Sequence, residues 1–125
     1  MRPPSGLLRE PFLVPGGTYG DQLWDWDSYW VFLGLTAIMG RDADARENLT
    51  RYAMGSWRNF FAHQADNGVV PILIEADRAD PFGCCREDGA ANQAKPILAQ
   101  FALAISDWSR SVDWLRPHVD GLIRF

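Results

Sequence analysis

Two stretches of the chain are apolar on nearly every side, and each is followed by a stretch with regularly spaced apolar positions. The first, 27–39 (DSYWVFLGLTAIM), contains no proline and is followed by Gly40, a common residue just past a helix end. The second, 93–108, contains the run ILAQFALAI and has Pro96 in its first turn, where proline is tolerated. The pattern predicts two buried helices.

The stretches after them predict amphipathic helices. In 42–65, apolar residues recur every three or four positions with arginine and glutamate between them. A fourth helix is expected over 113–125, where Pro117 is tolerated only near the helix start. Between these helices, 68–75 (GVVPILIE) is short, β-branched and interrupted by Pro71, which predicts an extended edge segment.

The other segments predict loops. Residues 1–20 hold four prolines and four glycines, which is typical of an extended lead-in with a tight turn. The long loop 76–91 is rich in aspartate, arginine and glycine, and loops of this length are usually functional.

The two helices that are apolar on nearly every side determine the expected fold, because such helices need neighbours on every side. We therefore expect an all-α fold of about two α/α hairpins from a larger closed layer, with a large apolar surface exposed in isolation.

Composition and charge narrow the class of protein. The chain is 47% hydrophobic and 22% charged, as in ordinary globular proteins. Its longest nearly apolar stretch, 30–39, is about half the roughly 20 residues that a membrane-spanning helix needs, and its start lacks an apolar signal-peptide core. We expect a cytoplasmic protein without a membrane partner. The net charge is −4 and the basic residues are scattered, which argues against nucleic acid.

The spacing of cysteine and histidine residues in the sequence does not match a known metal-binding or redox motif. Cys84 and Cys85 are adjacent, which matches neither a zinc ribbon nor a CxxC redox pair, and a disulfide between them would be strained. This spacing favours a reducing compartment. His63 and His118 lie far apart in the sequence, outside any zinc-binding motif. We expect no cofactor and no metal.

Three of the six tryptophans fall within seven residues, Trp24 to Trp30. Aromatic faces stack on sugar rings and carboxylates accept hydrogen bonds from sugar hydroxyls, so this segment predicts a carbohydrate site. The structural alternative is that Asp27 caps the helix and Trp30 belongs to the core. Because residues two apart point to opposite sides of an extended segment, Asp25 and Asp27 are not expected to form a catalytic pair.

The stretch 11–35 (PFLVPGGTYGDQLWDWDSYWVFLGL) resembles the trehalase signature, and the motif 26–29 (WDSY) matches its end residue for residue. The chain departs from the signature at Thr18, Tyr19 and Asp21, where trehalases have arginine, phenylalanine and glutamate, and by one extra residue before Trp26. The missing arginine argues against trehalose itself as the substrate.

Two further segments continue the resemblance in order. The stretch 91–100 (ANQAKPILAQ) is similar to the lysine–proline form found in bacterial α-glucosidases and mannosylglycerate hydrolases. The segment 68–71 (GVVP) resembles their Gly-Phe-Ile-Pro segment. The resemblance covers most of residues 11–108.

The resemblance implies an (α/α)6 toroid, of which 1–125 would be the N-terminal part of one catalytic domain, with the sugar pocket at the N-terminal ends of the inner helices. It implies substrate-binding roles for the following residues: Tyr19, Trp24, Asp25, Trp26, Asp27, Gln93 and Lys95. Tyr19 would stack on a sugar, and Gln93 and Lys95 would donate to hydroxyls or contact an anionic aglycone. For Lys95, the alternative is an ordinary surface lysine.

The function implied is that of an inverting α-glycoside hydrolase, in which an acid protonates the leaving oxygen and a carboxylate activates water. The family's acid and base are expected beyond residue 125, so no catalytic residue is assigned here. The expected ligand is a small glucoside or mannoside, and the expected partner is the remainder of the barrel. A non-catalytic helical carbohydrate-binding or interaction module is the alternative. Isoprenoid cyclases also have helical toroids, but the chain lacks their aspartate-rich magnesium motifs.

Overall fold

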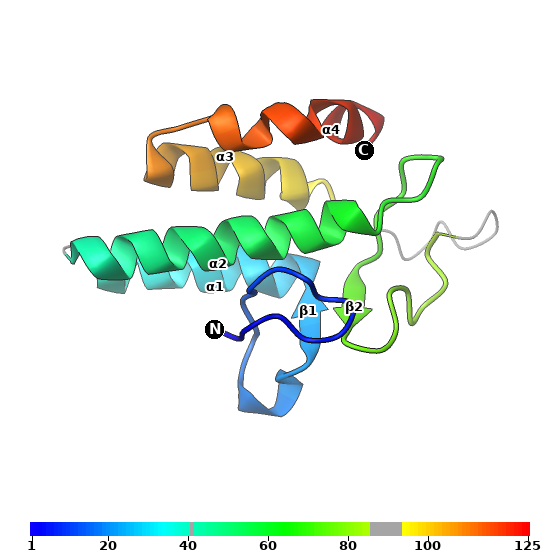
Figure 1. Cartoon of the computed structure of the whole chain (residues 1–125), viewed down its shortest axis with the longest axis horizontal. Coiled ribbons are helices and arrows are strands. Elements are labelled where there is room, and N and C mark those ends of the chain that lie inside the picture. Colours follow the sequence, from blue (N-terminus) through cyan, green and yellow to red (C-terminus); the bar gives the residue numbers. More distant parts are fainter. Residues whose placement is uncertain (41, 86–93) are drawn as a thin grey trace.

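The computed structural model describes residues 1–40, 42–85 and 94–125, and its fold is all-α with one small antiparallel strand pair (Figure 1). In chain order, the elements are η1 (Gly17–Tyr19), β1 (Gln22–Trp24), α1 (Asp25–Met39), α2 (Ala43–Ala62), β2 (Leu73–Glu75), α3 (Ile97–Ser109), η3 (Asp113–His118) and α4 (Val119–Arg124). Within the described residues, no helix combines the length and apolar character needed to cross a bilayer.

The first helix begins earlier than the sequence predicts. Trp24 is its N-cap residue with extended backbone angles, and the helix runs from Asp25 to Met39 with Gly40 as its C-cap. The interpretation of Asp27 as the N-cap is therefore wrong, because both aspartates lie in the first helical turn. Carboxylates in this turn are favoured by the partial positive charge of the helix N-terminus.

The second helix is the amphipathic one that the periodicity predicts, although it ends at Ala62 rather than 65. The Asp42 side chain caps its start by accepting a hydrogen bond from the Ala45 N–H at 2.9 Å. The helix stops because the N–H groups of His63 and Gln64 bond back to carbonyls of the preceding turn, which is a common way to close a helix end.

Strand β2 covers only Leu73–Glu75, a smaller part of the predicted 68–75 segment. It pairs antiparallel with β1, a strand between the lead-in and the first helix that the sequence pattern does not predict, and Leu23 lies opposite Ile74. Both of these side chains are fully buried. The pairing depends on a partner about fifty positions away in the sequence, so the local pattern of 22–24 does not reveal it.

The last helices also differ from their predicted bounds. Helix α3 begins at Ile97, with Pro96 as its N-cap residue rather than inside the first turn. The predicted helix over 113–125 is divided into η3 and α4, and Pro117 lies within η3. The tighter 3-10 winding accommodates a proline that would interrupt the hydrogen bonds of an α-helix.

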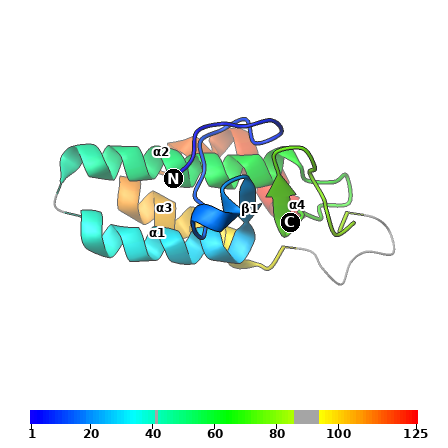
Figure 2. The same ribbon diagram turned by 90° about the horizontal axis from the view of Figure 1, so that it is seen from below.

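Helices α1 and α3 run parallel, and α2 runs antiparallel to both (Figures 1 and 2). At one end, the Lys95 N–H donates to Asp25. At the other end, a Cβ on Gly40 would lie 3.8 Å from the Trp108 ring, and the Arg46 guanidinium of α2 lies 4.0 Å from the centre of that ring. The N-terminal ends of α1 and α3 therefore share one rim of the molecule.

Trp57 of α2 is at the centre of the core and is fully buried. Its indole N–H donates to the Leu98 carbonyl at 2.9 Å. Its ring stacks on the Phe61 ring with 3.9 Å between the ring centres, and the Trp114 ring contacts it edge-on with 5.2 Å between the ring centres. One side chain thus joins α2, the start of α3 and η3.

The lead-in packs along α2, although it contains no regular helix. Asn59 of α2 accepts from the Glu10 N–H and donates to the Glu10 carbonyl, and the Ser56 hydroxyl accepts from the Leu13 N–H. Gly55 allows the chain to cross here, because a Cβ would overlap the Pro11 carbonyl oxygen. The lead-in is therefore an ordered part of the structure.

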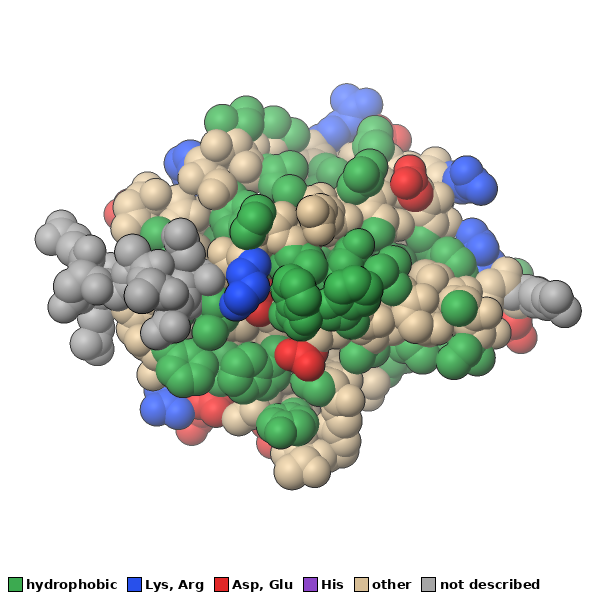
Figure 3. Space-filling model, turned by 180° about the vertical axis from the view of Figure 1, so that it is seen from behind, with side chains coloured by type: hydrophobic (Ala, Val, Ile, Leu, Met, Phe, Trp, Pro, Cys, Tyr) green, Lys and Arg blue, Asp and Glu red, His purple; other side chains and the backbone are tan. Residues whose placement is uncertain are grey.

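Neither α1 nor α3 is buried on every side. On α1, Trp26, Trp30 and Ile38 are 46%, 50% and 80% exposed and follow one another at intervals of four or eight residues, and on α3 Leu103 is 63% exposed. Figure 3 views the molecule from the side of α1 and shows hydrophobic side chains gathered on this face. The expectation that both helices are buried on every side is therefore wrong, and apolar side chains of α1 and α3 are exposed to solvent.

Candidate functional site

Asp25 joins the two predicted motifs at the shared rim. Its side chain is 2% exposed, and its two oxygens accept separate hydrogen bonds from the Trp26 N–H at 2.6 Å and the Lys95 N–H at 3.0 Å. The Ser28 hydroxyl donates to the Trp24 carbonyl at 2.6 Å and holds the same turn. The tryptophan–aspartate motif and the lysine–proline motif therefore meet at this carboxylate.

Asp25 and Asp27 have different surroundings, although not for the reason expected from an extended segment. Both lie in the first turn of α1, where residues two apart are separated around the helix axis. Asp25 points inward to Lys95, whereas Asp27 is half-buried and lines a small hollow. Asp25 is thus a structural link between two helices, and Asp27 is the carboxylate available to a ligand.

Burial raises the pKa of the Asp25 carboxyl above its ordinary value of 3.8, and the N–H groups of Lys95 and Trp26 only partly oppose this effect. Because the folded state holds this proton more tightly than the unfolded state, the stability that the group contributes is present below pH 3.8 and is lost as the pH rises through the raised pKa.

We expect an NMR titration of the Asp25 carboxyl to give a midpoint above pH 3.8. A midpoint at or below that value would contradict the buried geometry, and Asp25→Asn identifies the resonance.

Two exposed aromatic side chains of α1, Trp26 and Trp30, form a surface beside Asp25 that we call the tryptophan ledge. The Trp26 and Trp30 rings are 5.8 Å apart, and the Tyr29 ring is 5.2 Å from Trp30, both in edge-on arrangements. With Lys95 and Gln100, among other residues, these side chains line an open hollow of about 340 Å³. The assignment of Trp30 to the core is wrong, because half of its surface is exposed.

A second hollow, of about 210 Å³, is lined by Pro15, Tyr19, Trp24 and Asp27. Tyr19 is 47% exposed on the short helix η1. These two hollows contain the described residues of the predicted site that reach the surface of the rim. Gln93 and the preceding residues of its motif, 91 and 92, lie outside the described residues.

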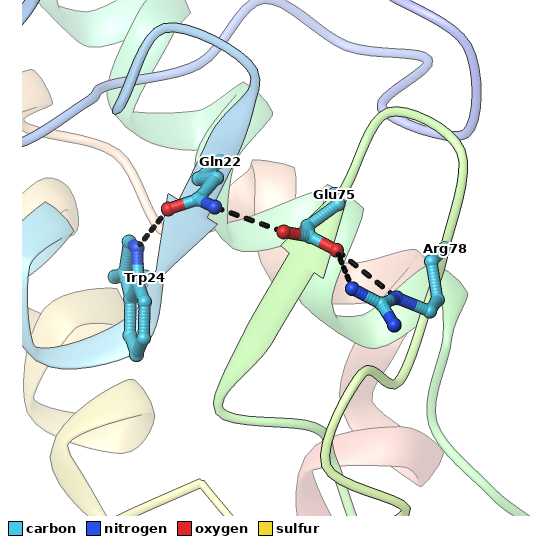
Figure 4. A network of polar contacts seen from close by, with 4 residues as sticks. All are labelled: Gln22, Trp24, Glu75 and Arg78. Atoms are coloured by element: carbon cyan, nitrogen blue, oxygen red, sulfur yellow. Dashed lines mark hydrogen bonds and ion pairs between the residues drawn. The ribbon is translucent and has the colours of Figure 1, made fainter. Parts of the chain in front are cut away.

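The orientation of Trp24 depends on a chain of polar contacts across the strand pair (Figure 4). The Trp24 indole N–H donates to Gln22 at 3.1 Å, the Gln22 amide donates to Glu75 at 2.8 Å, and Glu75 pairs with Arg78 at 2.6 Å. Hydrogen bonding from Arg78 lowers the pKa of Glu75 below its ordinary value. Glu75 and Arg78 were not predicted as site residues, because only the pairing of Gln22 with Glu75 in the sheet brings them here.

The adjacent cysteines are not joined by a disulfide. The Asp80 carboxylate accepts from the N–H groups of both Cys84 and Cys85. Burial raises the pKa of the Cys85 thiol to about 11, which disfavours the reactive thiolate. Among the described residues, no three His, Cys, Asp or Glu side chains are grouped as a metal site would require.

The described residues of the ledge and of the hollow next to it can therefore offer aromatic faces, the Asp27 carboxylate and the Lys95 ammonium group to a ligand. Comparisons of the chain with models of known protein families, with curated proteins and with solved structures found no match.

Proposed function

We propose that this chain supplies the sugar-binding rim of an inverting α-glycoside hydrolase acting on a glucoside or mannoside. The observation that carries the proposal is the ledge of Trp26 and Trp30, half-exposed beside the carboxylate of Asp27 and next to Lys95. Exposed aromatic rings provide the apolar faces on which sugar rings stack. Asp27 and Lys95 supply an acceptor and a donor for sugar hydroxyls.

Bond cleavage in this proposal requires groups from the remainder of a helical barrel. Asp25 is unsuited to be the general acid or base, because both of its oxygens already accept backbone hydrogen bonds and it is almost fully buried. Further helices would cover the apolar face that continues from the ledge along α1 and α3 to Ile38 and Leu103. The parallel direction of α1 and α3 supports this arrangement, since it places both helix starts at one rim.

A non-catalytic carbohydrate-binding module is the second candidate. It is favoured by the same environment of Asp25, which leaves Asp27 as the one accessible carboxylate among the described residues of the ledge and its adjoining hollow. An inverting hydrolase needs two carboxyl groups on opposite sides of the sugar bond. A screen of the full-length protein for hydrolysis, with the product anomer followed by NMR, separates the two candidates.

Replacing Trp26 with alanine is expected to weaken saccharide binding about tenfold or more, equivalent to about 1.4 kcal/mol. The reason is the loss of one stacking face. Calorimetric titrations with methyl glucoside, methyl mannoside, trehalose, glucosylglycerate and mannosylglycerate measure the change.

The matched control is Ile38→Ala, which removes another exposed apolar side chain from the same helix, away from the rim. It is expected to leave the affinity within about twofold of wild type, because Ile38 lines neither hollow of the rim. The proposal fails if none of these ligands binds the wild-type protein, or if Trp26→Ala and Ile38→Ala bind equally well.

A further inference from the structure

A third hollow adjoins the rim at the end of the strand pair. It measures about 680 Å³, and its lining includes Arg2, Tyr19, Asp21, Glu75, Asp77 and Arg78. Tyr19 also lines the smaller hollow that contains Trp24 and Asp27. The two hollows therefore share one exposed aromatic side chain as a common wall.

The hollows follow one another along the rim. Asp27 lines the middle hollow, and the preceding residue, Trp26, lines the aromatic one. Tyr19 separates the middle hollow from the large one at the other end. In order, these are the large hollow, which we call the polar hollow, then the middle hollow, and then the hollow at the tryptophan ledge, and Tyr19 lies at the boundary between the first two.

The polar hollow carries charges of both signs. The Glu75 carboxylate is paired with Arg78 at 2.6 Å, and the Arg2 guanidinium donates to the Gly20 carbonyl at 2.9 Å. Asp21 and Asp77 are exposed carboxylates of the lining. An anion would meet these carboxylates and a cation would meet the arginines, so the lining favours a neutral ligand with many hydroxyl groups.

The contacts of Trp24 connect the polar hollow to the middle one. Gln22 and Glu75 belong to the wall of the polar hollow, and the Trp24 ring belongs to the middle hollow. The hydrogen bonds from Trp24 to Gln22 and from Gln22 to Glu75 hold these walls together (Figure 4). The strand pairing thus places both binding surfaces in one arrangement before a ligand arrives.

We propose that the rim binds an oligosaccharide of at least three sugar units, one against each hollow, with the outer unit in the polar hollow. This inference rests on the proposed carbohydrate function and assigns its ligand a length. The inner units stack on aromatic rings, and the outer unit is held by hydrogen bonds to planar polar groups such as the Asp77 carboxylate.

The test is a calorimetric titration of the full chain with gluco- and manno-oligosaccharides of one to five units. In the wild-type protein, the affinity is expected to rise about tenfold or more from one unit to three. In Asp77→Ala, the ratio between the affinities for the three-unit and one-unit ligands is expected to fall by about tenfold. Asp66→Ala, which removes an exposed aspartate outside the three hollows, controls for the change in net charge and should keep the wild-type ratio.

The outcomes distinguish this inference from the function on which it rests. If no saccharide of any length binds, the proposed carbohydrate function fails, and the extended rim fails with it. If one-unit ligands bind but longer ones bind no more tightly, only the extended rim is overturned. The same conclusion follows if Asp77→Ala keeps the length dependence of the wild-type protein.

Discussion

Replacing Trp57 with alanine is expected to lower the free energy of unfolding by about 3 to 5 kcal/mol. The Trp57 side chain is fully buried and contacts Phe61, Trp114 and His118 through its rings. Its loss would leave a large cavity where α2 meets α3 and η3, and it would remove the indole hydrogen bond to the Leu98 carbonyl. Urea denaturation followed by far-UV circular dichroism measures the change.

Two variants make this expectation specific. Trp57→Phe keeps a ring against Phe61 but removes the indole N–H, so a smaller loss of about 1 to 2 kcal/mol is expected. Trp30→Ala removes a tryptophan that is 50% exposed, and it should cost no more than about 1 kcal/mol. Equal losses for Trp57→Ala and Trp30→Ala would mean that the core is not centred on α2.

Replacing Asp25 with alanine is expected to destabilise the protein by about 2 to 4 kcal/mol, because it leaves two backbone N–H groups at the rim without their acceptor. One belongs to the first turn of α1 and the other precedes α3. The loss should exceed the gain from removing a buried carboxyl group whose pKa is raised. Thermal and urea denaturation at one fixed pH give the difference.

The matched control is Asp27→Ala. Asp27 lies in the same turn of α1 but is only half-buried and accepts neither of these two hydrogen bonds. Its replacement should cost less than about 1 kcal/mol, mainly through the lost interaction with the helix N-terminus. If both alanine variants lose the same stability, Asp25 does not join α1 to α3 as described.

The presence of a helix in this chain can be predicted from the pattern of neighbouring residues. The spacing of apolar residues in 42–65 predicts a helix, and the structure has α2 at Ala43–Ala62 with Asp42 as its cap. Repeating side-chain contacts within one turn and the cap residue are both encoded within a few positions. The all-α fold was predictable for this reason.

Contacts between distant segments were not predictable in the same way. Strand β1 was missed because its hydrogen-bonding partner is β2, and a three-residue segment has too short a pattern to reveal a strand. Trp30 was assigned to the core because large apolar side chains are usually buried. Its exposure depends on which sides of α1 its neighbours cover.

The sequence by itself determined where helices form and which residue types could bind a sugar, because both depend on the chemistry of residues close together in the chain. Only the tertiary structure decided that Asp25 bonds to the N–H of Lys95, seventy residues further on, while Asp27 lines a surface hollow. It also decided that Glu75 and Arg78 support Trp24. The physical reason is that burial and hydrogen-bond partners are set by the packing of whole helices, which no short stretch of sequence contains.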